Sequence, residues 1–265
     1  MKQLLAPIAA AALVLMMGSA SAAGVFEDFT VNETIVPGSN VLGIGLPNPA
    51  LVADKLNGGY TERLTVTGVN TFAAQAVADF TGFFKNDGTL SVTSLLNSNE
   101  LIGGYKIYAV FSASGAITGP NAFQSSNNTF KLYLDTSSDT SFTLTDGVTA
   151  PVLAGTGEDQ LLASAGPGLT FGTGNLTGPP GAFNIDWGNF ALSAFGKTYF
   201  VNPDPFYLNV RVNGDYDVLK TTPIGNTVEI TGDVSAVFVV PEPTSLALAG
   251  LALLALGAST RRKSI

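Results

Sequence analysis

Acidic side chains within turn-rich segments are the groups in this sequence best suited to chemistry. They occur in "LDTSSDTSFTLTDG" (134–147), "VNPDPFY" (201–207) and "VNGDYD" (212–217). Carboxylates combined with Asn and Gly in turns can bind calcium, which takes about 6 to 8 oxygen ligands. The EF-hand loop spacing is absent, and Asp and Asn also accept backbone N–H groups in ordinary turns. We expect no cofactor, with calcium as an open alternative at four residues: Asp135, Asp139, Asp215 and Asp217.

A pair of carboxylates at the right separation can also hydrolyse a glycosidic bond. The candidates for such a pair are Glu62, Glu100, Glu158 and Glu229. Their spacing in the sequence does not identify any two of them as a pair, and no motif marks one of them as a nucleophile. We therefore expect a protein that is not an enzyme, and we keep a secreted carbohydrate-active enzyme as the alternative.

The composition excludes several other kinds of chemistry. The chain has no Cys and no His, which excludes disulfides, thiol catalysis, Ser-His-Asp triads and Cys- or His-bound metals. Four of the 12 basic residues and one of the 20 acidic residues lie outside residues 24–239, so this region has a net charge of −11. Because such a charge repels phosphate backbones, we expect no nucleic-acid partner.

The elements that must position these groups are predicted to be strands. Apolar and polar residues alternate with a period of two in 105–111, 130–135, 206–213 and 234–240, which is typical of half-buried strands. Turn signals occur in "NGGY" (57–60), "KNDGT" (85–89), "TDG" (145–147) and "VNGDY" (212–216). The sequence therefore predicts an all-β fold, a single antiparallel β-sandwich or jelly-roll-like domain.

Some segments between these strands leave alternatives open. Residues 71–80 could form a short helix, and residues 157–168 could form one or two helical turns. The Gly- and Pro-rich segment 166–188 is predicted to be a long loop. Trp187, which has polar neighbours, is predicted to be partly exposed.

The two ends of the chain are predicted to be targeting segments. Residues 1–23 contain Lys2, an apolar stretch and a small-residue tail, which together indicate a secretory signal peptide. Residues 240–265 contain Pro241-Glu242-Pro243, an apolar run and a basic end. The apolar run is close to the minimum length for a membrane helix, with its basic end on the cytoplasmic side. We therefore expect an extracellular β-domain over residues 24–239.

The C-terminal tail resembles the PEP-CTERM sorting signal of Gram-negative bacteria. The residues that carry the resemblance are Pro241, Glu242, Pro243, Arg261, Arg262 and Lys263, with the apolar helix 244–260 between them. The resemblance implies that the chain is exported, held transiently in the inner membrane by this helix and processed by an exosortase. It also implies delivery to the cell surface or the extracellular space alongside exopolysaccharide.

The region before the tail is similar to the flocculation-associated PEP-CTERM proteins. The matching segments are "FEDFTVNET" (26–34), "ADKLNGGYTE" (53–62), "KLYLDTSSDTSF" (131–142), "EDQLLASA" (158–165) and "GDVSAVFVVPEP" (232–243). This similarity implies a non-enzymatic surface or matrix protein that acts with exopolysaccharide in floc or biofilm formation. A surface adhesin that keeps its C-terminal anchor remains a further alternative.

Overall fold

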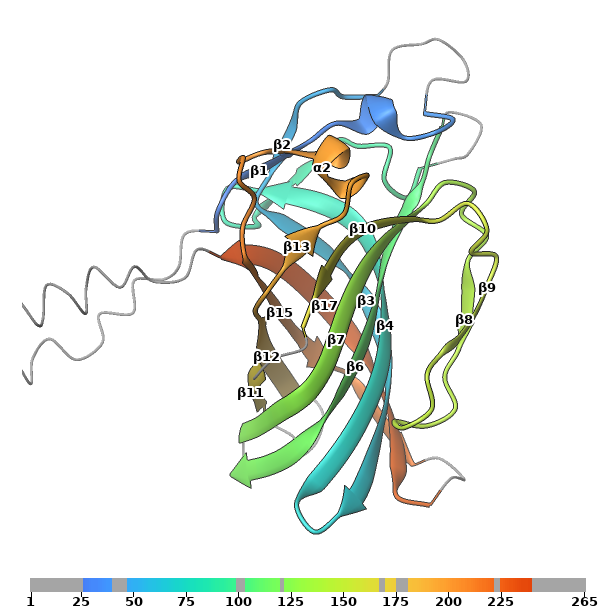
Figure 1. The fold of residues 1–265 in the computed structure, drawn as a ribbon, viewed down its shortest axis with the longest axis vertical. Coiled ribbons are helices and arrows are strands. Elements are labelled where there is room, and N and C mark those ends of the chain that lie inside the picture. Colours follow the sequence, from blue (N-terminus) through green and yellow to red (C-terminus); the bar gives the residue numbers. More distant parts are fainter. Residues whose placement is uncertain are drawn as a thin grey trace, which may run out of the picture.

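A computed structural model describes residues 26–39, 47–98, 103–119, 122–166, 170–174, 181–221 and 225–239. These residues form a mostly β structure built around one large, curled antiparallel sheet, which confirms the predicted all-β antiparallel class (Figure 1). The predicted signal peptide (1–23) and C-terminal sorting helix lie outside the described residues, so the predicted domain boundaries stay predictions.

The central sheet contains the long strands of the chain. Its longer members are β3 (Lys55–Gly68), β4 (Thr71–Lys85), β6 (Lys106–Gly119), β7 (Ala122–Asp135), β12 (Gly181–Trp187), β15 (Asn209–Tyr216) and β17 (Thr227–Val239). Its shorter members are β5 (Leu90–Val92), β10 (Gln160–Ala165), β11 (Thr170–Gly174), β13 (Ala191–Leu192) and β16 (Val218–Thr221). The strand order is β11-β12-β15-β17-β3-β4-β6-β7-β10-β13.

The sheet closes on itself through β11. This strand pairs with β12 on one side and, through residues 170–173, with residues 122–125 of β7 on the other. Eight strands, from β11 round to β7, therefore form a hydrogen-bonded ring. An eight-stranded closed sheet has an interior just wide enough to be filled by side chains or to hold one small ligand.

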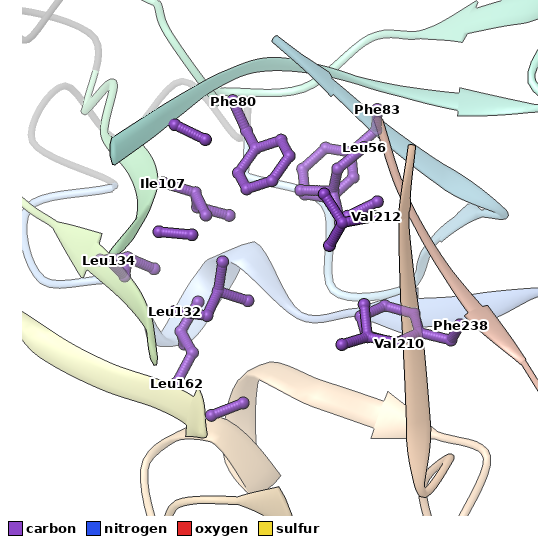
Figure 2. Close-up of a cluster of buried hydrophobic side chains, with 14 of the residues drawn as sticks. Leu56, Phe80, Phe83, Ile107, Leu132, Leu134, Leu162, Val210, Val212 and Phe238 are labelled. Atoms are coloured by element: carbon purple, nitrogen blue, oxygen red, sulfur yellow. The ribbon is translucent and has the colours of Figure 1, made fainter. Parts of the chain in front are cut away.

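The interior of the ring contains the main hydrophobic core (Figure 2). The alternation predicted for residues 105–111 and 130–135 is confirmed, because Ile107, Leu132 and Leu134 are almost completely buried there. Val210, Val212 and Phe238 converge on them from β15 and β17. Each such apolar side chain contributes about 1.5–3 kcal/mol when it is buried.

Two of the four predicted turns are wrong. Residues 57–60 and 212–216 lie within β3 and β15, not between strands. Gly58 sits where the pairing of β3 with β4 shifts register, and a Cβ atom there would lie 1.9 Å from the carbonyl oxygen of Asp79. The glycines in these segments therefore permit close backbone approach inside the sheet. Turns do occur at 86–89 and around 145–147, as predicted.

The predicted helical alternatives and the long loop are also corrected by the structure. Residues 71–80 belong to β4, and residues 160–165 form β10. The segment 166–188 contains β11 and β12, which are the strands that close the ring. Local composition was misleading in these segments because strand preference depends on the packing and burial that the whole sheet provides.

One end of the sheet is covered by the short elements of the chain. A three-stranded sheet joins β1 (Phe29–Val31) to β2 (Leu51–Ala53) and β14 (Phe200–Asn202). The helical turns η1 (Glu33–Ile35) and α2 (Gly196–Tyr199) lie at the same end, as Figure 1 shows for α2. Aromatic rings fill this cap; Phe238, for example, contacts Phe29, Phe200 and Phe206 edge-on with centroids 4.8–5.7 Å apart.

A separate hairpin covers part of the outer face of the sheet. It consists of β8 (Ser141–Thr143) and β9 (Val152–Ala154). Phe142 and Leu153 from the hairpin pack near Val77 of β4 and Tyr108 of β6. This second cluster explains why Tyr108 is buried although it points away from the interior of the ring.

Candidate functional site

Asp135 has a structural role at the end of β7. Its side chain is completely buried, and its two carboxylate oxygens accept the backbone N–H groups of Ser137, Ser138 and Thr140 at 3.0, 2.6 and 3.0 Å. These bonds shape the loop that follows the strand. Asp135 therefore has the ordinary turn role of accepting backbone N–H groups, which the sequence offered as the alternative to calcium binding.

Asp139 and Glu158 approach Asp135 from the surrounding loops. One carboxylate oxygen from each of the three residues lies within 4.8 Å of the others. A hydrogen bond from the Ser137 hydroxyl to Glu158 is the main cause that lowers the pKa of that carboxyl group. Glu158 was not predicted as a calcium ligand, because only the pairing of β10 with β7 brings it here. Calcium at this cluster stays a prediction.

Asp215 and Asp217 lie elsewhere, on β15 and just after it. Asp215 accepts the N–H of Asp233 at 3.2 Å, and the Asp217 N–H donates to the Thr231 carbonyl at 3.0 Å. Among the described residues, neither Asp belongs to a group of three acidic side chains. The structure thus brings Asp135 and Asp139 together, whereas Asp215 and Asp217 are not part of their acidic cluster.

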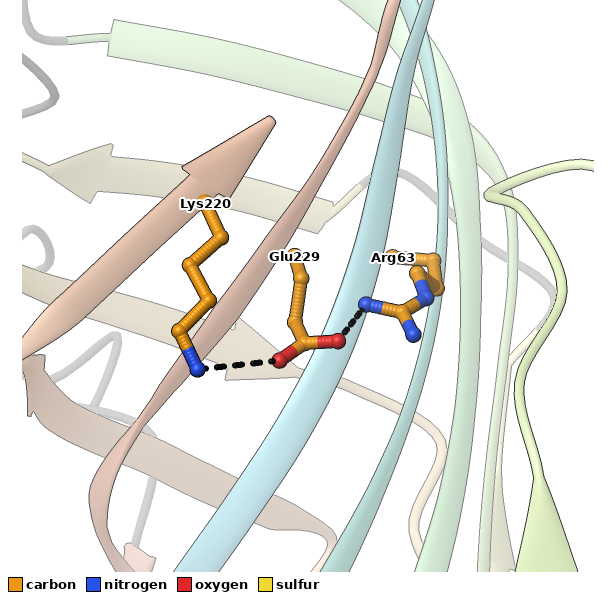
Figure 3. A network of polar contacts seen from close by, with 3 residues as sticks. All are labelled: Arg63, Lys220 and Glu229. Atoms are coloured by element: carbon orange, nitrogen blue, oxygen red, sulfur yellow. Dashed lines mark hydrogen bonds and ion pairs between the residues drawn. The ribbon is translucent and has the colours of Figure 1, made fainter. Parts of the chain in front are cut away.

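Among the described residues, the glutamates named in the sequence do not form a carboxylate pair. Glu229 forms ion pairs with Arg63 and, at 3.9 Å, with Lys220 (Figure 3). Glu158 is in the cluster with Asp135 and Asp139, Glu62 faces the interior of the ring, and Glu100 lies outside the described residues. The three candidates that the structure describes therefore occupy three different environments.

The interior of the ring contains two adjoining cavities, of about 60 and 100 Å³. Both cavities are lined by Tyr60, Glu62, Ala74, Ala113, Phe183 and Ile185. The space arises because β4 and β6 direct small alanine side chains inward, opposite the larger side chains of β12. These cavities are therefore one candidate for a ligand site in the described part of the chain.

Glu62 is the one carboxylic acid among the residues that line the two cavities. Its neighbours in register are Ala76 on β4 and Ile230 on β17, so its strand position is flanked by apolar side chains. Within the described residues, its carboxyl group has no hydrogen-bond or ion-pair partner. Burial raises the pKa of Glu62 to about 7, because an apolar setting disfavours the charged form.

Trp187 lines the smaller cavity from the end of β12. Its side chain is 2% exposed, so the partial exposure expected from its polar neighbours is wrong. The indole N–H is buried and has no hydrogen-bond partner among the described residues. Sequence reasoning missed this position because it depends on which face of β12 turns inward.

A larger and more open groove lies at the capped end of the sheet. It has a volume of about 640 Å³ and is bordered by segments 190–192 and 200–208. Lys197 and Asp204 bring opposite charges to it, and Tyr207 contributes an aromatic ring. The Tyr207 hydroxyl donates to the carbonyl oxygen of Asp28 at 2.7 Å, which orients the ring.

Comparison with known proteins identifies the C-terminal segment. Residues 239–263 match the PEP-CTERM protein-sorting motif, which confirms the predicted sorting signal. The chain thus carries a PEP-CTERM sorting motif, which implies export, processing by an exosortase and delivery to the cell surface. Its exported part contains the curled β-sheet described above.

The comparisons do not extend beyond this motif. No curated protein and no solved structure matches the chain. The resemblance to flocculation-associated proteins has no support from them and stays a prediction. Among the described residues, no helix has the length and apolar character needed to cross a membrane; the predicted sorting helix lies outside these residues.

Proposed function

We propose that this chain is a non-enzymatic matrix protein that acts with exopolysaccharide in floc or biofilm formation. The observation that carries the proposal is the sorting motif at residues 239–263. A protein sent to the cell surface by this route works where secreted polymer accumulates. In this proposal the exosortase acts near Pro241-Glu242-Pro243, after the signal peptide has directed export and the C-terminal helix has paused in the inner membrane.

The groove at the capped end is the surface that we assign to the polysaccharide. Aromatic rings stack on the apolar faces of sugars, and charged or polar groups bind their hydroxyl groups. Tyr207, Lys197 and Asp204 supply these two kinds of contact around one groove. The interior cavities are too small for a polymer, which supports the choice of the more open groove.

The enzymatic alternative is less well supported by the geometry. Glycoside hydrolysis by the common route takes two carboxyl groups on either side of the scissile bond. The interior cavities offer Glu62 alone, and the Asp135–Asp139–Glu158 cluster uses the buried Asp135 to hold its own loop. Incubating the exported protein with matrix polysaccharide and measuring new reducing ends tests this alternative directly; their appearance would contradict the non-enzymatic proposal.

A deletion strain tests the biological role. We expect the strain to make polysaccharide in normal amounts but to form fewer flocs, because the proposed role lies in assembly and not in synthesis. Normal flocs in the deletion strain would contradict the proposal. Mass spectrometry of the surface protein separates processing from permanent anchoring: an intact C-terminal peptide containing Arg261 would favour the anchored adhesin.

The groove is tested by matched substitutions in the exported protein. Tyr207→Ala removes the ring and should weaken co-sedimentation with the polysaccharide, whereas Tyr207→Phe keeps the ring and should retain binding. Lys197→Ala should also weaken binding, and Lys220→Ala on β16 serves as the control lysine. Equal binding by all four variants would exclude this groove as the contact surface.

A further inference from the structure

The cavities inside the ring combine an apolar wall with one isolated acid. Aromatic rings from four different strands contribute to the wall: Phe72, Phe111, Phe123 and Phe183. Glu62 lines both cavities and has no protein partner within the described residues. The Glu62 side chain is half-buried, so it keeps some access to solvent, but its apolar surroundings disfavour the charged form of its carboxyl group.

A second polar group that lacks a partner belongs to a residue that lines the smaller cavity. The indole N–H of Trp187 is buried at the wall of the smaller cavity, which Glu62 also lines. Unpaired buried donors are uncommon in folded proteins and call for a specific explanation. The unpartnered carboxyl group of Glu62 and the apolar wall around it point to a ligand that is small, mostly apolar and polar at one end.

The charge that this ligand carries follows from the residues around Glu62. The titratable groups lining the cavities besides Glu62 are Tyr60 on β3 and Tyr216 on β15; β4, β6, β7, β12 and β17 contribute uncharged side chains. No Lys or Arg is among these lining residues, so the protein supplies no positive charge to Glu62 there. A cationic ligand would supply it, and aromatic faces attract cations as well.

The size of the space limits the ligand further. A cavity of about 150 Å³ with an apolar lining is known to hold one benzene ring. The adjoining cavities of 60 and 100 Å³ are of this order. A single aromatic ring or a short alkyl chain therefore fits, whereas a disaccharide or a long lipid chain does not.

We propose that the interior of the ring is a binding site for a small amphipathic amine, whose ammonium group pairs with Glu62 while its apolar body lies against the aromatic wall. Trp187 borders the site and is the one tryptophan of the chain, so its fluorescence reports on occupancy. The site is separate from the groove assigned to polysaccharide, and neither assignment depends on the other.

Benzylamine is the probe, and benzyl alcohol is its uncharged counterpart of the same shape. The exported protein, purified from the cells that make it, is titrated with each compound above pH 7, because burial raises the pKa of Glu62 to about 7. We expect benzylamine to change the Trp187 fluorescence and to raise the melting temperature, with benzyl alcohol binding more weakly. Benzylamine binding should weaken as the pH falls below 7, because protonation removes the charge of Glu62.

Glu62→Gln and Glu158→Gln are the matched variants. Glu62→Gln keeps the shape of the side chain and should weaken benzylamine binding by roughly 10-fold or more, with benzyl alcohol unaffected. Glu158→Gln removes an exposed carboxylate outside the cavities and should change neither affinity. No response to benzylamine by the folded wild-type protein at any pH would overturn the proposal. Equal affinities of wild type and Glu62→Gln for the amine would overturn it as well.

Discussion

The hydroxyl oxygens of Tyr105 and Tyr199 lie 2.6 Å apart inside the cap, and the Tyr105 hydroxyl also donates to the Glu33 carboxylate at 3.0 Å. Because one hydroxyl group has one proton, Tyr199 must be the donor to Tyr105. The resulting chain runs from Tyr199 through Tyr105 to Glu33, which also accepts the backbone N–H of Leu95 at 2.8 Å. It links α2 and η1 to Tyr105, the residue just before β6, by hydrogen bonds between buried groups.

This order predicts unequal effects of two otherwise identical substitutions. Tyr105→Phe removes a donor to Glu33 and the acceptor of Tyr199, and should lower the free energy of unfolding by about 1–3 kcal/mol. Tyr199→Phe removes only the hydrogen bond from Tyr199 to Tyr105. The bond from Tyr105 to Glu33 remains, so the loss should be about 1 kcal/mol. Urea unfolding of both variants measures this difference. A double variant should lose less free energy of unfolding than the sum of the two single losses. Strictly additive losses would contradict the proposed chain of hydrogen bonds.

Asp135→Asn should destabilise the domain although it changes few atoms. The Asn side chain has one oxygen and one NH₂ group, so it cannot accept all three N–H groups that the Asp135 carboxylate accepts. We expect a loss of about 1–3 kcal/mol in urea unfolding. The control is Asp139→Asn in the same loop, where the exposed side chain should cost no more than about 0.5 kcal/mol. Equal losses of stability in the two variants would show that the burial of Asp135 does not explain the effect.

Gly58→Ala should destabilise the sheet because its new methyl group meets the backbone of β4. The Cβ atom would lie 1.9 Å from the Asp79 carbonyl oxygen, so β3 and β4 would have to move apart. We expect a loss of about 1–3 kcal/mol and a lower melting temperature. Gly157→Ala is the control, since a Cβ atom there has no neighbour within 4 Å. If the Gly58→Ala protein were as stable as Gly157→Ala, this would contradict the close approach of β3 and β4 at Gly58.

Glu62 should make stability depend on pH in a defined direction. Its pKa is about 7 in the folded protein and 4.5 in the reference state, so between these values the folded state binds more protons. The free energy of unfolding should therefore fall as pH rises through this window, by up to about 3 kcal/mol. Partial solvent access to Glu62 makes this figure an upper limit.

Comparison with Glu62→Gln isolates this contribution. Burial also raises the pKa of Asp54, Asp79 and Asp159, which act in the same direction. Because these groups remain in the variant, the difference between the two stability–pH curves belongs to Glu62. The variant should lose less stability between pH 4.5 and 7, as measured by denaturant unfolding. Parallel curves would contradict the assignment of the raised pKa to this residue.

Part of the fold and part of the site could be predicted from local sequence. The alternation of Phe130, Leu132 and Leu134 predicted both a strand and its buried face, because successive side chains point to opposite sides of a sheet. The same logic failed at Leu208, which precedes β15 and is 62% exposed. The two Gly-containing segments within β3 and β15 were mistaken for turns, because glycine suits turns and close strand contacts equally well.

The sequence by itself determined the antiparallel β class, the acidic character of the exported region and the sorting motif at residues 239–263, since each depends on local pattern or composition. Only the tertiary structure decided that β11 closes the ring, that Glu158 joins Asp135, and that Glu62 and Trp187 line one cavity. The physical reason is that these relationships depend on the register between strands far apart in the chain. A shift of one residue would turn Glu62 to the opposite face of the sheet.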